Sequence, residues 1–201
     1  MKYLKLKTLN WILAIIFITS CAPTKLTPET QSINGTENKL KKKANSLSSW
    51  EISGAIAARN SKKSWTASLN WIQRGMNQYQ INLMGPLGNG AVVVERSGEN
   101  VTFIDGNKKV TSSNADELLY RQTGIRLPVN SLYYWVRGLP APNTIKSAQY
   151  DANTNLIILN QSGYNINYTE YKTINNVNLP TKMQLNGNGL VIKIIIKQWK
   201  I

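Results

Sequence analysis

The chain has 201 residues and a formal net charge of +14, with 24 lysine and arginine residues against 10 aspartate and glutamate residues. It contains no histidine and one cysteine, Cys21, which excludes disulfide bonds within the chain, histidine-dependent catalysis and most zinc or iron sites. The adjacent carboxylates Asp116 and Glu117 fall at the start of a predicted helix, where the helix dipole favours negative charge. We therefore expect a protein that is not an enzyme and that uses no metal or cofactor.

The N-terminus has the pattern of an export signal. Three lysines in residues 1–7 precede an apolar stretch, Leu9–Ile18, which only Asn10 interrupts and which is too short to span a bilayer. The stretch ends in Ile-Thr-Ser before Cys21, which resembles the lipobox of bacterial lipoproteins. We expect residues 1–20 to be removed and Cys21 to carry a diacylglyceryl group on its sulfur and an N-acyl group. The alternative is an apolar signal followed by an incidental cysteine.

Residues 21–48 are expected to hold the domain at a distance from its lipid anchor. Residues 22–35 are rich in Pro, Thr, Ser and Asn and predict a flexible tether, and residues 36–47 predict a short basic helix. Loss of three lysines with the signal lowers the formal charge to +11. The basic surface is either simply solvated or attracted to anionic lipid headgroups or an acidic protein, and a nucleic acid partner is not expected for an exported, anchored chain.

Residues 49–201 are expected to form one mainly β domain. Apolar and polar residues alternate along many short segments, which is typical of half-buried strands. Asp105-Gly106-Asn107 and Asn186-Gly187 mark hairpin turns, and short connections favour antiparallel neighbours. The predicted strands are 50–58, 65–71, 79–83, 90–96, 100–105, 108–112, 145–150, 156–161, 164–171, 181–185 and 190–199.

Two helices interrupt the strands. Ser113 to Asp116 resembles a capping box and predicts a helix that ends at Gly124. A second helix is predicted from Pro128 to Gly138, with its apolar residues on one face. These helices would cover the concave side of a curled sheet, and the interior would be either an apolar cavity or a packed core. The sequence pattern leaves both possibilities open.

The domain carries a succession of short motifs. They are Trp71 with Tyr79, Gly85-Pro86-Leu87-Gly88, 118–124, 127–132, Trp135-Val136-Arg137-Gly138-Leu139-Pro140, Asn178-Leu179-Pro180, Met183, Leu185 and Trp199. Their order from about Trp50 to Trp199, behind the lipobox, resembles that of the LolB family of outer-membrane lipoprotein receptors. The chain departs from the family where Tyr164-Asn165-Ile166-Asn167-Tyr168 replaces a strand that often carries tryptophan.

The resemblance implies an open, incomplete β-barrel of about eleven antiparallel strands, with helices covering its concave, apolar side. It implies a monomeric lipoprotein at the periplasmic face of the outer membrane. Such a protein takes lipoproteins from the periplasmic carrier LolA, holds their acyl chains and places them in the inner leaflet. From their strand faces and their places beside the family motifs, the expected acyl-chain cavity residues are Trp65, Leu69, Trp71, Ile81, Leu83, Trp135, Tyr168, Met183 and Ile194.

Leu87 lies in a loop whose glycines and proline force a sharp turn between two strands. A leucine at such a tip is either tucked into the core or held out to water, and the pattern alone favours the first. The family resemblance implies the second, with Leu87 protruding and needed for membrane insertion of cargo. Two other functions remain open at this point, a lipid or glycolipid shuttle of related half-barrel form and a structural outer-membrane lipoprotein without a cavity.

Overall fold

The computed structural model describes residues 46–88 and 90–201. The predicted signal peptide, Cys21 and the tether with its basic helix lie almost wholly outside the described residues and remain predictions. The described part contains eleven strands, two α-helices and one short 3-10 helix. Their bounds are β1 (Ser49–Arg59), β2 (Ser64–Arg74), β3 (Gln78–Met84), η1 (Pro86–Gly88), β4 (Ala91–Ser97), β5 (Asn100–Asp105), β6 (Lys108–Ser112), α2 (Ala115–Thr123), α3 (Val129–Trp135), β7 (Ile145–Tyr150), β8 (Leu156–Gln161), β9 (Tyr164–Ile174), β10 (Val177–Gly187) and β11 (Leu190–Lys200).

All eleven strands form one antiparallel sheet in the order β6-β5-β4-β3-β2-β1-β11-β10-β9-β8-β7. Two runs of hairpins meet where the first strand, β1, pairs with the last, β11. The sheet does not close, because β6 and β7 are its two edges. The predicted strands and the unclosed antiparallel sheet are therefore confirmed.

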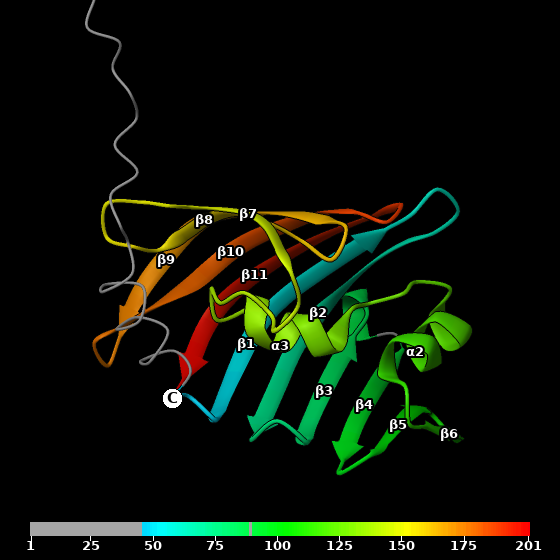
Figure 1. Cartoon of the computed structure of the whole chain (residues 1–201). Coiled ribbons are helices and arrows are strands. Elements are labelled where there is room, and N and C mark those ends of the chain that lie inside the picture. The colour runs from blue at the N-terminus through cyan, green and yellow to red at the C-terminus, as the bar shows by residue number, and fades with distance from the viewer. Residues whose placement is uncertain (1–45, 89) are drawn as a thin grey trace, which may run out of the picture. The chain divides into compact units, whose positions relative to one another are not determined.

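Strand alternation places one face of the sheet in the core. Along β2 the side chains of Ala67, Leu69 and Trp71 are buried, whereas Thr66 and Ser68 between them are exposed. The connection between the edge strands β6 and β7 carries α2 and α3 across this apolar face, and Figure 1 shows both helices on that side of the sheet. The helices thus form a layer over the buried face, as predicted.

Gly54 allows β1 and β11 to pair closely. The register between them shifts at Ser53 and Gly54, and a Cβ atom at Gly54 would overlap the carbonyl oxygen of Ile195. Only glycine fits such an approach without moving one of the two strands. This contact joins the N-terminal and C-terminal halves of the sheet.

The cap of α2 differs from the predicted one by one residue. The N-cap is Asn114, whose Oδ1 accepts a hydrogen bond from the Glu117 backbone N–H at 3.0 Å. The predicted pair of Ser113 and Asp116 is wrong, because the Asp116 carboxylate instead accepts a hydrogen bond from the backbone N–H of Val129 at 3.0 Å. Asp116 therefore ties the start of α2 to the start of α3.

The second helix ends earlier than predicted. Its regular part stops at Trp135, and the chain then turns through Gly138, which has a φ of 72°. Arg137 within this turn is 2 % exposed, with its guanidinium 4.0 Å from the ring centre of Tyr133 and Nη1 donating to the Leu47 carbonyl at 3.0 Å. Burial lowers the pKa of Arg137 from its ordinary value. The turn is thereby fixed against the segment that precedes β1.

No helix among residues 46–88 and 90–201 is long and apolar enough to cross a membrane. The same residues contain no cluster of three or more side chains suited to hold a metal ion.

Candidate functional site

The apolar hollow is a small cavity between the sheet and the helix layer. Its volume is about 20 Å³, which is room for about one water molecule. Its lining is entirely apolar and comes from five strands, from α2 and α3 and from the segment that joins the helices. The lining residues are Ile56, Leu69, Trp71, Ile81, Leu83, Val94, Leu119, Leu127, Val129, Leu132 and Ile194.

The sequence left open whether the interior is an open cavity or a packed core, and the structure shows a nearly filled one. Leu119, Leu127 and Leu132 of the helix layer are each at most 5 % exposed and face the strands across the hollow. Binding sites for small molecules commonly measure about 300–1,000 Å³. An acyl chain therefore fits here only if the helix layer moves away from the sheet.

Five of the nine predicted cavity residues line the hollow: Leu69, Trp71, Ile81, Leu83 and Ile194. The register explains this grouping, since Leu69 pairs with Leu83 and Trp71 pairs with Ile81 across β2 and β3. Their predicted contact with acyl chains stays a prediction.

The other four predicted residues lie elsewhere. Trp135 donates from Nε1 to Gln161 Oε1 at 2.9 Å, and Tyr168 donates from its hydroxyl to the Trp135 carbonyl at 3.0 Å. Met183 pairs with Tyr168 across β9 and β10. These three pack in the half of the core under β8–β10, and Trp65 is half-buried near the start of β2.

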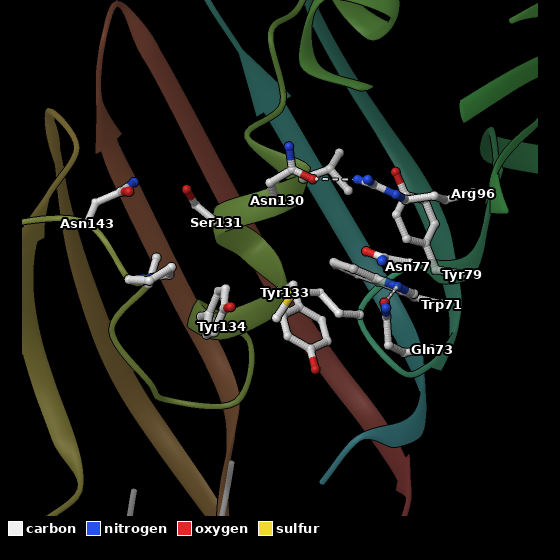
Figure 2. Close-up of a pocket in the computed structure, with 14 residues that line it drawn as sticks. Trp71, Gln73, Asn77, Tyr79, Arg96, Asn130, Ser131, Tyr133, Tyr134 and Asn143 are labelled. Atoms are coloured by element: carbon white, nitrogen blue, oxygen red, sulfur yellow. Dashed lines mark hydrogen bonds between the residues drawn. The ribbon is translucent and has the colours of Figure 1, made fainter. Parts of the chain in front are cut away.

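A larger cavity, which we call the polar cleft, was not predicted from the sequence. Its volume is about 330 Å³, and it lies between the β2–β3 turn, α3 and the loop that precedes β7. Figure 2 shows the side chains of β2, β3 and β4 facing those of α3 across it. The lining residues are Trp71, Gln73, Met76, Asn77, Tyr79, Arg96, Val129, Asn130, Ser131, Tyr133, Tyr134, Ala141, Pro142 and Asn143.

Arg96 and Tyr79 form the polar centre of one wall. They stand opposite each other on β4 and β3. Arg96 donates from Nε to the Gly98 carbonyl at 2.9 Å and from Nη1 to Asn130 Oδ1 at 3.2 Å, the second shown as a dashed line in Figure 2. The Tyr79 side chain is buried, and burial raises the pKa of its hydroxyl well above the ordinary value, so the hydroxyl is neutral and able to donate.

Gln161 fixes the loop on the opposite side of the cleft. Its side chain is 2 % exposed and makes four hydrogen bonds, accepting from Trp135 Nε1 and from the Ala141 N–H and donating to the carbonyls of Ala141 and Asn143. The side chain is thus fully satisfied, which holds the loop against α3 and β8.

Polar ties between the helix layer and the sheet are few among the described residues. At the end of α2, Asn60 Nδ2 donates to the Gly124 carbonyl at 3.0 Å, and Lys63 Nζ lies 3.4 Å from the Thr123 carbonyl oxygen. At the start of α3 the tie is the hydrogen bond from Arg96 to Asn130. At its end, Trp135 is tied to Gln161 of β8 and to Tyr168 of β9 by the two buried hydrogen bonds described above. Apolar packing therefore supplies most of the attachment.

The loop between β3 and β4 contains η1. The Gly85 N–H donates to the Gly90 carbonyl at 3.0 Å, and Gly88 and Gly90 have φ values of 78° and 73°. This hydrogen bond and the two left-handed glycines produce a tight turn that contains the backbone of Leu87. The Leu87 side chain and Asn89 lie outside the described residues, so the predicted role of Leu87 stays a prediction.

The fold is similar to that of a LolA superfamily protein from Nitrosomonas europaea. The two structures superpose with a TM-score of 0.55 at 9% sequence identity, covering 82% of this chain and 93% of the other. This similarity supports the unclosed half-barrel fold.

The sequence comparisons identify the family. The model of the family described as outer membrane lipoprotein LolB matches residues 48–199. The outer-membrane lipoprotein LolB of Coxiella burnetii is 36% identical over 155 residues, covering 77% of this chain and 73% of that protein. The protein of the same name from Pseudomonas paraeruginosa is 37% identical over 161 residues, covering 80% of this chain and 78% of that protein. This chain therefore belongs to the outer membrane lipoprotein LolB family.

Proposed function

We propose that this chain is an outer-membrane lipoprotein that receives other lipoproteins from the periplasmic carrier LolA and inserts them into the inner leaflet of the outer membrane. Membership of the LolB family is the observation that carries the proposal. The entirely apolar lining of the hollow supports it, because fatty tails need a site without polar groups. Such a transfer of lipoproteins requires no covalent chemistry.

Affinity for acyl chains would set the direction of transfer. Each methylene group removed from water contributes about 0.8 kcal/mol, so a site that holds two more methylenes than the carrier binds about fifteenfold more tightly. The bilayer then solvates the tails completely, which makes the last step favourable.

The hollow would open by displacement of the helix layer. Leu119, Leu127 and Leu132 would leave the sheet and pack on the acyl chains instead, so the apolar area that they bury is largely kept. The hydrogen bonds beside the hollow that would break, from Asn60 to Gly124 and from Arg96 to Asn130, join partly exposed groups that water can satisfy. The buried bonds of Trp135 with Gln161 and Tyr168 would stay intact and hold the far end of α3 on the sheet. A low opening cost is therefore compatible with the packed state.

Leu87 would act in release at the membrane. The domain would be held near the bilayer by acyl groups on Cys21, behind a signal peptide of residues 1–20 and a tether of residues 21–48. A leucine at the tip of the β3–β4 loop could then enter the headgroup region. We predict that Leu87→Glu retains folding and cargo acceptance but blocks insertion into liposomes, whereas Leu87→Met inserts cargo normally. Normal insertion by Leu87→Glu would rule out this role.

Transfer itself is the test of the proposed function. A radiolabelled lipoprotein bound to LolA is mixed with this chain, and the label on each protein is followed after separation. We expect the label to move to this chain and, when liposomes are added, into the lipid. Label that stays on LolA would overturn the proposal.

The small volume of the hollow favours one alternative, a structural outer-membrane lipoprotein that binds no lipid. A fluorescent fatty acid separates the two functions, because a receptor should bind it and shift the emission of Trp71 in the hollow wall. No binding and unchanged tryptophan emission would favour the structural role.

A further inference from the structure

The polar cleft opens beside the apolar hollow, and the two share Trp71 and Val129 in their linings. A ligand that reaches from one to the other would meet an apolar wall first and hydrogen-bonding groups afterwards. The hollow must widen to accept a ligand, whereas the cleft already measures about 330 Å³. The cleft is therefore the preformed part of an amphipathic site.

One hydroxyl in the cleft is buried without a partner. Tyr79 is 6 % exposed, and its hydroxyl has no hydrogen-bond partner among the described residues. A buried hydroxyl that makes no hydrogen bond destabilises the folded chain, so such a group calls for an explanation. The hydroxyl is enclosed in the wall of the cleft, so a ligand acceptor would satisfy it once the neighbouring side chains shift to let the acceptor in.

Arg96 and Asn130, which lie near Tyr79 in the cleft lining, also have hydrogen-bond donors that are not used within the described residues. Arg96 uses Nε and one Nη1 hydrogen in its two bonds, which leaves N–H groups on Nη1 and Nη2. Glu99 reaches this guanidinium only at 4.0 Å and is itself 85% exposed. The Asn130 amide accepts from Arg96 through Oδ1, which leaves its Nδ2 as a donor. The free donors of Arg96 and Asn130 thus lie beside each other where β4 meets α3, and Tyr79 stands next to Arg96 on β3.

The donors are one guanidinium, already near the Glu99 carboxylate, and two neutral groups, and such a set can bind carbonyl oxygens. Arg96 is the one permanently charged side chain in the lining of the cleft, whereas a phosphate site normally combines several cations. A lipidated cysteine has ester and amide carbonyls at the point where its acyl chains join the peptide. These carbonyls would lie at the cleft when the tails lie in the hollow.

We propose that the polar cleft binds the ester and amide carbonyls of the cargo's lipidated N-terminus, with Tyr79, Arg96 and Asn130 as the hydrogen-bond donors. This inference rests on the proposed function and deepens it. The site would recognise the linkage that marks a lipoprotein, in addition to its tails. Membrane phospholipids have ester carbonyls as well, so the test must separate the two sources.

The experiment measures binding to the mature chain with Cys21→Ser, which removes its own acyl groups as competitors. The probes are a synthetic triacylated cysteinyl peptide with two ester-linked tails, its analogue with two ether-linked tails, and dipalmitoyl phosphatidylglycerol. The variants are Tyr79→Phe, which removes only the unpartnered hydroxyl, and Arg96→Met. Arg74→Met is the matched control, because Arg74 is an exposed arginine of β2 outside the cleft lining. Thermal unfolding confirms that each variant is folded.

We expect the parent chain to prefer the ester peptide over the ether peptide. Tyr79→Phe should weaken ester binding by about fivefold and Arg96→Met by about tenfold or more. Binding of the ether peptide, which keeps only its amide carbonyl, should change less. Arg74→Met should bind both peptides as the parent does. The Tyr79→Phe chain should be at least as stable as the parent.

Equal binding of both peptides by the parent, with no effect of either cleft variant, would overturn the inference and leave the proposed function standing. Phosphatidylglycerol that competes as well as the ester peptide would overturn the assignment to cargo. A parent chain that binds neither peptide would instead refute the proposed function.

Discussion

Leu132→Ala tests whether the apolar hollow is the place where acyl chains enter. Leu132 is 3 % exposed and lines the hollow from α3. Removing three carbons costs about 2.4 kcal/mol of lost transfer free energy. A further 50 Å³ or so of unfilled volume would add about 1.2 kcal/mol. The expected loss in the free energy of unfolding is therefore about 3–4 kcal/mol, measured by urea denaturation.

The same substitution should improve ligand binding. The unfilled volume costs about 1.2 kcal/mol only while the hollow is empty, because an acyl chain that enters can fill it. We expect the affinity for a fluorescent fatty acid to rise several-fold. Leu159→Ala is the matched control, because Leu159 on β8 is fully buried but does not line the hollow.

The comparison between the two variants decides the matter. Both should unfold at lower urea concentration than the parent, but only Leu132→Ala should gain affinity. If both variants gain affinity for the fatty acid equally, the gain comes from the general destabilisation of the domain, and the hollow is not the entry site. If neither variant gains affinity while Leu132→Ala is destabilised, the opening of the helix layer is refuted.

Three further predictions concern stability. Burial raises the pKa of Asp116, so the stability that this carboxyl contributes is complete below its ordinary pKa and is lost as the pH rises through the raised pKa. Asp116→Asn keeps an acceptor for the Val129 N–H but carries no charge. It should therefore raise the thermal midpoint near neutral pH, and the gain should become smaller in acid. An unchanged midpoint at all pH values would contradict this. Gln161→Ala removes the partner of three buried groups and of the partly buried Asn143 carbonyl, and it should cost at least about 3 kcal/mol in urea unfolding, whereas exposed Gln149→Ala should cost about nothing. Gly54→Ala should lower the thermal midpoint by forcing β1 away from Ile195, and a midpoint equal to that of the parent would show that the two strands adjust freely.

The sheet could be predicted from the sequence because its strands are half-buried. In β2, small polar residues alternate with Leu69 and Trp71, and a period of two has no other common explanation. Paired turn residues, such as Gly106 with Asn107, set the hairpins. The N-cap of α2 was harder to predict, because Ser113 and Asn114 are both good N-cap residues. The choice of Asn114 depends on the contact from Asp116 to Val129, which joins residues from two different helices.

The site could be predicted only in part. Alternation identifies which side chains face the core, and five of the predicted residues line the hollow, although their contact with acyl chains stays a prediction. It does not report how far α3 sinks toward the sheet, so the near absence of free volume could not be foreseen. The polar cleft depends on the pairing of Tyr79 with Arg96 and on the loop that Gln161 holds, contacts that join residues far apart in sequence.

Photochemical labelling from cargo tests the central claim most directly. A lipoprotein with a diazirine near the end of one acyl chain is transferred from LolA to this chain, and the complex is irradiated. Peptide mass spectrometry then identifies the residues of this chain that carry the label. The account predicts labels on the residues of the hollow, above all in β2, β3 and the segment from Leu127 to Leu132. Labels confined to the outer face of the sheet, or no label on this chain, would contradict it.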